Sequence, residues 1–293
     1  MPRVLILLIG EQPAPNLLPT QHLLPDTVVL VHTEKTNVIA QRLYDILTRK
    51  GFDVLQCKVE PYNLSAIQDN LQQFIKERFQ GCEIIFNLTG GTKIMSLAGF
   101  LIALQLNVPF VYFQTKGSQS LLYYYQFTDQ KSMQIQNQEV ISDHISLDDY
   151  LRAQIGEYTY DQPRNKFEHQ IYETLKDIPE LEVFPSVKPQ SLGALEIDFV
   201  IRLGNRVGVI EAKTKGAKSG IDQIQAVAEQ RYLGTYVTKF LISGSSVDIN
   251  NKNLAKAYNI EIIEVLSYTT NKSLSKEDRE KIQERILSRL RAK

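Results

Sequence analysis

The sequence has no tryptophan, only two cysteines and four histidines, and no excess of charge of either sign. Cys57 and Cys82 have neither the spacing of a metal site nor the number that a disulfide framework needs, so we expect small core residues. The histidines form no ligand-spaced cluster: His22, His32, His144 and His169. The 33 basic and 33 acidic residues cancel, so a nucleic-acid partner would need a local basic patch.

Long apolar segments are also missing. The apolar run at residues 4–9 is too short for a signal peptide or a membrane span, and no other segment is long and apolar enough to span a bilayer. We therefore expect a cytoplasmic protein with no membrane contact. The 293 residues exceed what one hydrophobic core usually serves, which predicts two domains. A hydrophobic fraction of 43% is enough for a sizeable core.

The first half of the chain alternates strand-like and helical patterns. Strand-like runs lie at residues 4–9, 27–32, 53–59, 83–87 and 110–113, and helical patterns at 36–50, 63–80 and 92–106. This order predicts a parallel sheet covered by helices, a Rossmann-like α/β domain. The run at 121–127 follows a Lys-Gly-Ser turn and indicates an added strand or hairpin.

Residues 134–164 lose clear periodicity, and we interpret them as a linker in which Ser146 starts a short capped helix. We expect one domain at residues 1–145 and a second, with the linker, at 146–293. After a helix at 167–175, strands are predicted at 182–187, 194–203, 206–213, 239–243 and 261–265. Helices are predicted at 220–233, 253–258 and 275–291. The second domain is therefore also α/β, with an antiparallel hairpin at its centre.

That hairpin carries the most informative side chains. Gly204 and Asn205 are a two-residue turn signal between two alternating strands. Pairing about this turn places Asp198 opposite Glu211, and the face they share is polar: Glu196, Asp198, Glu211 and Lys213. The other face is apolar: Ile197, Phe199, Ile201, Ile210 and Ala212. Opposed carboxylates repel each other, and a hard divalent cation would relieve the repulsion.

These residue types suit phosphodiester hydrolysis. Asp198 and Glu211 can hold Mg²⁺ or Mn²⁺, which polarises a phosphoryl oxygen and lowers the pKa of bound water. Lys213 can position that water or stabilise charge on the phosphate. The backbone carbonyl of Ala212 is a further candidate ligand, and Glu168, on the helix before the hairpin, can add another carboxylate.

A simpler interpretation is a solvated sheet face with a Glu196–Lys213 ion pair across the strands. It leaves the two opposed carboxylates unexplained and exposes three valines of the same face. Glu196 would then serve only as the partner of Lys213. Gln225 and Gln230, on the following helix, either approach the site or are ordinary surface residues.

Two segments could supply local basic patches. One carries Lys213, Lys215 and Lys218, and the other is the C-terminal helix with Arg285, Arg289 and Arg291. Basic residues near a helix C-terminus also complement the helix dipole, which is the simpler interpretation of the second segment.

The hairpin residues resemble the PD-(D/E)xK, restriction-endonuclease-like nucleases. The match consists of Asp198 and Glu211-Ala-Lys213, with Glu168 as the helix acid. Ile197 stands where the family pattern has proline, its loosest element. The resemblance implies a restriction-endonuclease-like α/β domain and a metal-dependent endonuclease.

A second motif, Asn87-Leu-Thr-Gly-Gly-Thr-Lys93, ends a strand and opens a helix, where backbone amides attract anions. It is neither a dinucleotide-binding fingerprint nor a Walker A loop. The loops at residues 10–16 and 32–36 should converge on it. We expect ligand contacts from Gln12, Asn16, Thr33, Thr36, Asn87, Thr89, Gly90, Gly91, Thr92 and Lys93. The simpler interpretation is a glycine-rich turn with a threonine N-cap.

These loops resemble the CARF domain, the sensor of cyclic oligoadenylates in type III CRISPR defence, over about the first 130 residues. With the second domain, the resemblance implies a homodimeric antiviral effector. A cyclic oligoadenylate, with cyclic tetra-adenylate the expected ring, would activate a Mg²⁺- or Mn²⁺-dependent nuclease. The implied substrate is DNA, single-stranded or nicked as a duplex, with RNA as a further candidate.

Two other functions remain open. One is a non-catalytic cyclic-nucleotide sensor or transcriptional regulator whose second domain binds DNA or a protein, although a strand-rich second half argues against a winged helix. The other is a nucleotide-using enzyme with its active site at residues 89–93.

Overall fold

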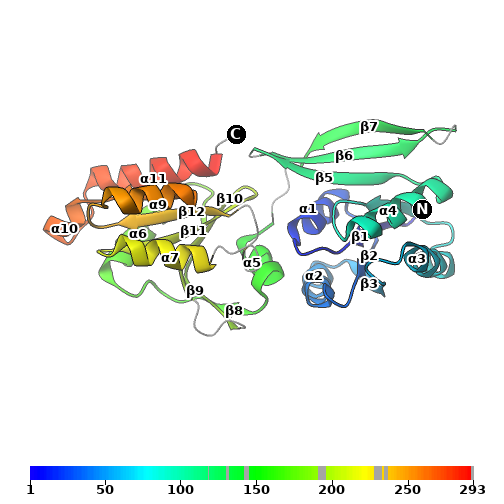
Figure 1. The fold of residues 1–293 in the computed structure, drawn as a ribbon, viewed down its shortest axis with the longest axis horizontal. Helices are drawn as coiled ribbons and strands as arrows, with labels where there is room; N and C mark the ends of the chain where they lie inside the picture. Colours follow the sequence, from blue (N-terminus) through cyan, green and yellow to red (C-terminus); the bar gives the residue numbers. More distant parts are fainter. Residues whose placement is uncertain are drawn as a thin grey trace. The chain divides into compact units, whose positions relative to one another are not determined.

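The computed structural model describes residues 1–117, 119–129, 132–141, 145–190, 196–227, 233 and 237–291. The chain divides into two compact units, Met1–Ile145 and Ser146–Lys293 (Figure 1). Each is built on one mixed sheet, of seven and six strands, which confirms the predicted α/β class. Among the helices described, none has the length and apolar character needed to cross a membrane.

The first unit alternates strands and helices through its first 116 residues. Its elements are β1 (Arg3–Leu8), α1 (Ala14–Leu23), β2 (Thr27–His32), α2 (Asn37–Arg49), β3 (Asp53–Lys58), α3 (Leu64–Arg78), β4 (Glu83–Asn87), α4 (Lys93–Leu106), β5 (Phe110–Lys116), β6 (Gln119–Phe127) and β7 (Met133–Val140). The sheet order is β3-β2-β1-β4-β5-β6-β7. The first five strands are parallel, and β6 and β7 continue the sheet antiparallel.

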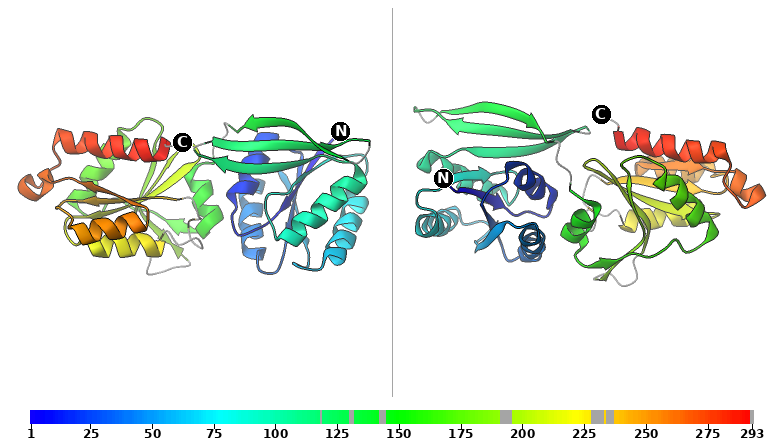
Figure 2. Two further views of the ribbon diagram at one scale, coloured as in Figure 1. Left: turned by 45° about the horizontal axis from the view of Figure 1, so that its top comes forward. Right: turned by 180° about the vertical axis from the view of Figure 1, so that it is seen from behind.

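Helices cover both faces of the parallel part of this sheet. Helices α3 and α4 pack on one face in a shared cluster with alternate residues of the strands, and α1 and α2 contact strands from the other (Figures 1 and 2). The central strand β1 is consequently an unbroken apolar run, and Val4 to Leu8 are all buried. The predicted helices at 36–50, 63–80 and 92–106 are confirmed as α2, α3 and α4 with their caps.

Two elements of this unit differ from the prediction. Residues 14–23 form α1, although the chain was expected to run as a loop to Asn16; Pro15 lies in the first turn, where its missing N–H costs no helical bond. Residues 133–140 form β7, although they were interpreted as linker. Strand β7 is the sheet edge and almost wholly exposed, and its apolar alternation is confined to Met133 and Ile135, too short to reveal a strand.

The elements of the second unit are α5 (Leu147–Ile155), β8 (Tyr158–Thr159), α6 (Lys166–Lys176), β9 (Glu182–Pro189), β10 (Ile197–Leu203), β11 (Arg206–Lys213), α7 (Ala217–Val227), β12 (Thr238–Ser243), α9 (Ile249–Ala257), β13 (Ile260–Glu264), α10 (Ser267–Asn271) and α11 (Lys276–Arg291). The sheet order is β13-β12-β11-β10-β9-β8. The Ser146 side chain accepts a hydrogen bond from Asp149 N and caps α5, as predicted. Because α5 packs in this unit's core, the linker interpretation is wrong here too.

The β10–β11 hairpin has the predicted register. Its pairs run from Leu203–Arg206 at the turn to Phe199–Ile210. Both of its faces are buried: Phe199, Ile201, Ile210 and Ala212 pack with α6 and α11, whereas Val200, Val207 and Val209 pack with α5, α7 and α9. Ile197, at the start of β10 and paired with Val187, groups with the valines instead of the face predicted for it. The burial of both faces excludes a solvated sheet surface.

Candidate active site and ligand-binding loops

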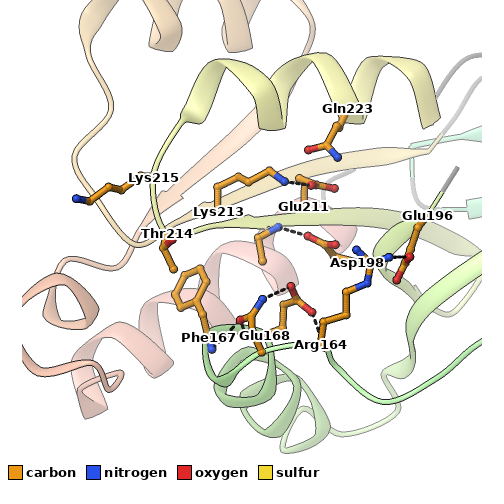
Figure 3. Close-up of a pocket in the computed structure, with 12 residues that line it drawn as sticks. Arg164, Phe167, Glu168, Glu196, Asp198, Glu211, Lys213, Thr214, Lys215 and Gln223 are labelled. Atoms are coloured by element: carbon orange, nitrogen blue, oxygen red, sulfur yellow. Dashed lines mark hydrogen bonds and ion pairs between the residues drawn. The ribbon is translucent and has the colours of Figure 1, made fainter. Parts of the chain in front are cut away.

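A polar cavity of about 360 Å³ lies in the second unit, where β10 begins and β11 ends. All the residues proposed for catalysis or metal binding line it: Glu168, Asp198, Glu211, Ala212 and Lys213. Figure 3 shows the side chains of Glu168, Asp198, Glu211 and Lys213 converging from α6, β10 and β11, below α7. Two strands and a helix therefore bring together residues that are up to 45 positions apart in the chain (Glu168 to Lys213).

Asp198 is buried at the start of β10, and its carboxylate is held by the neighbouring strand. Its Oδ2 accepts a hydrogen bond of 2.8 Å from the backbone N–H of Ala212. Burial raises the pKa of Asp198 and the charge of Glu168 raises it further, against the opposing effect of the Ala212 N–H. The basic groups of Lys213 and Arg164 also lower it, by less.

Glu211 is only 3% exposed. Burial, and next the negative charge of Asp198, raise the pKa of Glu211 to about 7. Lys213 opposes the shift, because its Nζ lies 2.7 Å from Glu211 Oε1 (Figure 3). Two buried carboxylates thus share one cavity, and Lys213 is ion-paired with one of them, an arrangement that favours binding of a cation.

Glu168 lies in the first turn of α6 and is also buried. Its Oε2 accepts a hydrogen bond of 2.8 Å from Arg164 N, and its Oε1 accepts one of 2.5 Å from the side-chain amide of Asn165. Asn165 in turn caps the helix by accepting from the backbone N–H of Glu168. The capping interaction fixes this carboxylate at the wall of the cavity that Asp198 also lines.

Glu196 does not pair with Lys213, so the alternative in which it serves only as the partner of Lys213 is wrong. Its carboxylate forms an ion pair with Arg164, and the ammonium of Lys188 is 3.8 Å away. Arg164 reaches it from the loop before α6, and strand alternation gives no signal for such a contact. Lys213 instead forms its ion pair with the carboxylate of Glu211.

Other lining residues were not predicted as site residues: Arg164, Asn165, Phe167, Thr214, Lys215 and Gln223. Lys215 was noted only as part of a basic segment. Gln223 lies on α7 above Glu211, whereas Gln225 does not line the cavity, because two helical positions differ by about 200° around the axis. Gln230 is outside the described residues.

The donor set fits a hard divalent cation. Within the described ranges, no three His, Cys, Asp or Glu side chains form a preassembled metal cluster. Asp198 and Glu211 nevertheless offer carboxylate oxygens whose pKa values are raised, first by burial and then by the charge of a neighbouring carboxylate, Glu168 for Asp198 and Asp198 for Glu211. A bound cation would offset this unfavourable burial of negative charge. Only oxygen ligands are present, which suits Mg²⁺ or Mn²⁺ rather than Zn²⁺.

Without metal, this carboxylate pair should reduce stability above neutral pH. The folded-state pKa of Glu211 lies above its ordinary value of 4.5, so the protein loses stability as the pH rises from 4.5 to about 7. In EDTA at pH 8, Glu211→Gln is expected to be more stable than the wild type, by about 3 kcal/mol at most. Urea unfolding at pH 8 and pH 4.5 measures this; an equal gain at both pH values would contradict it.

In the first unit, the predicted ligand loops follow neighbouring parallel strands. In the order β3-β2-β1-β4-β5, the chain continues from β1 toward one edge of the sheet and from β4 toward the other. The loops after these two strands therefore lead away from each other at the carboxyl ends of the strands, where open α/β sheets bind ligands. The loop after β4 leads directly into α4, whose N-cap is Thr92. Thr92 accepts a hydrogen bond of 3.1 Å from Met95 N and donates one of 2.8 Å to Pro61 O.

Several of the predicted ligand residues are buried and hold these loops together. Asn87 donates 2.8 Å to Pro15 O and accepts from both the N–H and the hydroxyl of Thr89. Thr89 accepts 2.7 Å from Phe113 N. Asn16 donates to the backbone of the central strand, 3.4 Å from Leu8 O.

The loop after β2 is closed in the same way. The hydroxyls of Thr33 and Thr36 lie 3.2 Å apart, and each accepts from the other's backbone N–H. His32, which precedes them, is buried. The predicted residues that remain partly or fully exposed are Gln12, Thr89, Gly90, Gly91, Thr92 and Lys93. They carry amides, hydroxyls and one ammonium group, the chemistry that phosphate needs.

Gly90 brings the loop into direct contact with the central strand. A Cβ at this position would lie 2.0 Å from Leu8 O, so Gly90→Ala must displace the backbone. We expect it to cost about 3 kcal/mol and to lower ligand affinity. Gly99→Ala is the matched control, since its Cβ meets a leucine methyl at 2.8 Å, which can rotate. Thermal unfolding measures the stability of both variants, and calorimetry measures their ligand affinity. Equal stability and affinity in the two variants would show that the loop can move to accommodate the added methyl group.

The sequence matches the family described as the Card1 CARF domain over residues 4–150. The fold is that of a Rossmann-like α/β domain joined to a second α/β domain. The chain belongs to the Card1 CARF domain family. No curated protein matches it in sequence.

Solved structures share the fold of this chain over most of its length. Can2 from Sulfobacillus thermosulfidooxidans, in complex with cyclic tetra-adenylate, has a TM-score of 0.75 at 16% identity, covering 98% of this chain and 99% of Can2. Protein VC1899 from Vibrio cholerae has a TM-score of 0.74 at 13% identity, covering 97% of each. A type III CRISPR defence DNA nuclease activated by cyclic oligoadenylate has a TM-score of 0.57 at 16% identity, covering 82% of this chain and 45% of the nuclease.

Proposed function

We propose that the chain is a metal-dependent endonuclease of type III CRISPR defence that a cyclic oligoadenylate switches on. The observation that carries the proposal is the pair of buried carboxylates, Asp198 and Glu211, with Lys213 beside them in one cavity. A structural ion pair would not require two carboxylates to share a buried site in which burial raises the pKa of both. Membership of the CARF family supports the sensing half of the proposal.

At the active site, Asp198, Glu211 and the carbonyl of Ala212 would hold Mg²⁺ or Mn²⁺. When bound, the ion supplies Lewis-acid polarisation of the phosphate and a more acidic water. Lys213, whose Nζ lies 2.7 Å from Glu211 Oε1 in the same cavity, would stabilise the negative charge that develops on the phosphate. Glu168 orients the constellation from its helix cap.

The activator would bind the first unit of each subunit in a homodimer. A ring of four adenylates has the two-fold symmetry of such a pair, so both subunits can present the same loop to it. Its phosphates would lie at the N-terminus of α4, beside Lys93 and the amides of residues 90–92. Binding selects the subunit arrangement in which the second units are competent to cut. Can2 in its complex with cyclic tetra-adenylate supports this choice of ring.

The experiment is a cleavage assay with Mn²⁺ and labelled single-stranded DNA, RNA and supercoiled plasmid, with and without cyclic tetra-adenylate. Cleavage that requires both metal and ring is expected, with DNA the preferred substrate. Cleavage that ignores the ring would contradict the gating. Tight binding of the ring without cleavage of any substrate would favour a non-catalytic sensor.

A further inference from the structure

A second cavity, of about 460 Å³, runs along the free edge of the sheet in the second unit. Its floor is β13, the last strand of that sheet, and its walls are α9 and α11. It shares no lining residue with the catalytic cavity. We name this feature the β13 groove.

The walls of the β13 groove are two basic stripes. Lys252 and Lys256 are one helical turn apart on α9, and Lys281, Arg285 and Arg289 recur every four residues on α11, so each set lines one face of its helix. Only two of the lining residues are acidic, and both are on β13. With five basic and two acidic groups, the lining has a net charge of +3. The chain as a whole is neutral, so this concentration of positive charge is local.

The basic groups are also held in place. Glu261 lies 3.4 Å from an Arg285 nitrogen and 3.9 Å from one of Arg289, whose guanidinium also donates 2.7 Å to Asn259. On the other wall, Lys252 pairs with Glu264 at 2.9 Å. Pre-ordered guanidinium groups lose less entropy when they bind a phosphate, so these contacts prepare the groove for an anionic polymer.

The groove begins at the catalytic edge of the sheet. Across the parallel strands, Lys213 on β11 pairs with Ser243 on β12, and Ser243 pairs with Glu264 on β13. Two strand spacings separate the catalytic strand from the groove, about 10 Å. Lys281, whose Nζ donates 2.7 Å to Glu264 O, marks this end, and Arg285 and Arg289 continue away from it.

We propose that the β13 groove binds the phosphate backbone of the nucleic-acid substrate beyond the scissile bond. The inference rests on the proposed nuclease function and adds a binding surface outside the catalytic residues. A nucleic acid held at Lys213 and extended across β12 meets a row of positive groups that neutralises successive phosphates. The groove then contributes affinity and salt dependence without base recognition.

The test compares Arg285→Gln/Arg289→Gln with the control Lys176→Gln/Lys276→Gln, which removes two exposed basic groups that are also ion-paired, each 3.8 Å from its glutamate. Fluorescence anisotropy of labelled DNA is followed against salt, on full-length protein with cyclic tetra-adenylate and Ca²⁺. The groove variant should bind roughly tenfold or more weakly, with a log–log salt slope smaller by about 2. The control should match the wild type.

Glu261→Gln supplies the opposite change. It removes the same ion pairs as the arginine variant but makes the groove more positive, so DNA affinity should rise severalfold. If both variants bind more weakly, the residues act only through the fold or protect a sheet edge from pairing. Cleavage of a dinucleotide, too short to reach the groove, should be unchanged in all variants. If the wild type binds DNA and the groove variant binds it equally well, this inference alone is overturned. If the wild type neither binds nor cleaves DNA, the proposed function is overturned as well.

Discussion

Asp198→Asn and Glu211→Gln are each expected to abolish metal-dependent cleavage while leaving the binding of cyclic tetra-adenylate unchanged. Each substitution keeps the size of the side chain and removes one negative charge from the cavity. Charge stabilisation by a bound cation is worth several kcal/mol, so the loss corresponds to about a thousandfold or more in rate. Glu211→Gln should at the same time stabilise the metal-free protein, so its inactivity cannot be ascribed to unfolding.

The measurements are single-turnover cleavage with Mn²⁺ and calorimetry of Mn²⁺ binding on the same preparations. Glu173→Gln is the control, because Glu173 is an exposed carboxylate on α6 whose nearest basic group is 3.8 Å away. It should cleave and bind Mn²⁺ as the wild type does. An Asp198→Asn variant that retained activity would move the metal site elsewhere in the chain.

The sequence predicts most of this site because the hairpin is local. A two-residue turn fixes the register of β10 on β11, and the register fixes which carboxylates share a face. The partner of Glu196 could not be predicted, because Arg164 comes from a loop outside the hairpin. The place of Gln223 depends on the rotation of α7 about its axis, which periodicity defines only loosely.

In the first unit, the sequence indicates which residues gather in the loops after the parallel strands but not what each one does there. Polar residues at the ends of parallel strands serve equally well to bind a ligand and to tie loops together. Asn87, Thr33 and Thr36 do tie the loops together through their hydrogen bonds. Burial separates the two roles, and burial depends on contacts between loops that are distant in the chain.

Lys93 is the predicted ligand residue whose loss should have the largest effect on activation. It is exposed in the first turn of α4, directly after the N-cap, where its ammonium adds to the positive end of the helix. A hydrogen bond between charged groups is worth about 2 kcal/mol. In a homodimer the ring meets two copies of Lys93, so Lys93→Ala should weaken its binding by roughly a thousandfold.

Activation should fail with binding. At a ring concentration that saturates the wild type, Lys93→Ala should cleave no faster than the ring-free enzyme, and raising the ring concentration should restore the rate, because the catalytic cavity is untouched. Calorimetry of cyclic tetra-adenylate and a titrated cleavage assay measure both effects. Lys76→Ala, an exposed lysine of α3, is the control. If cleavage required Lys93 at saturating ring but the ring bound normally, Lys93 would act after binding; if cleavage required Lys93 but was indifferent to Glu211, the active site would lie at the α4 loop instead.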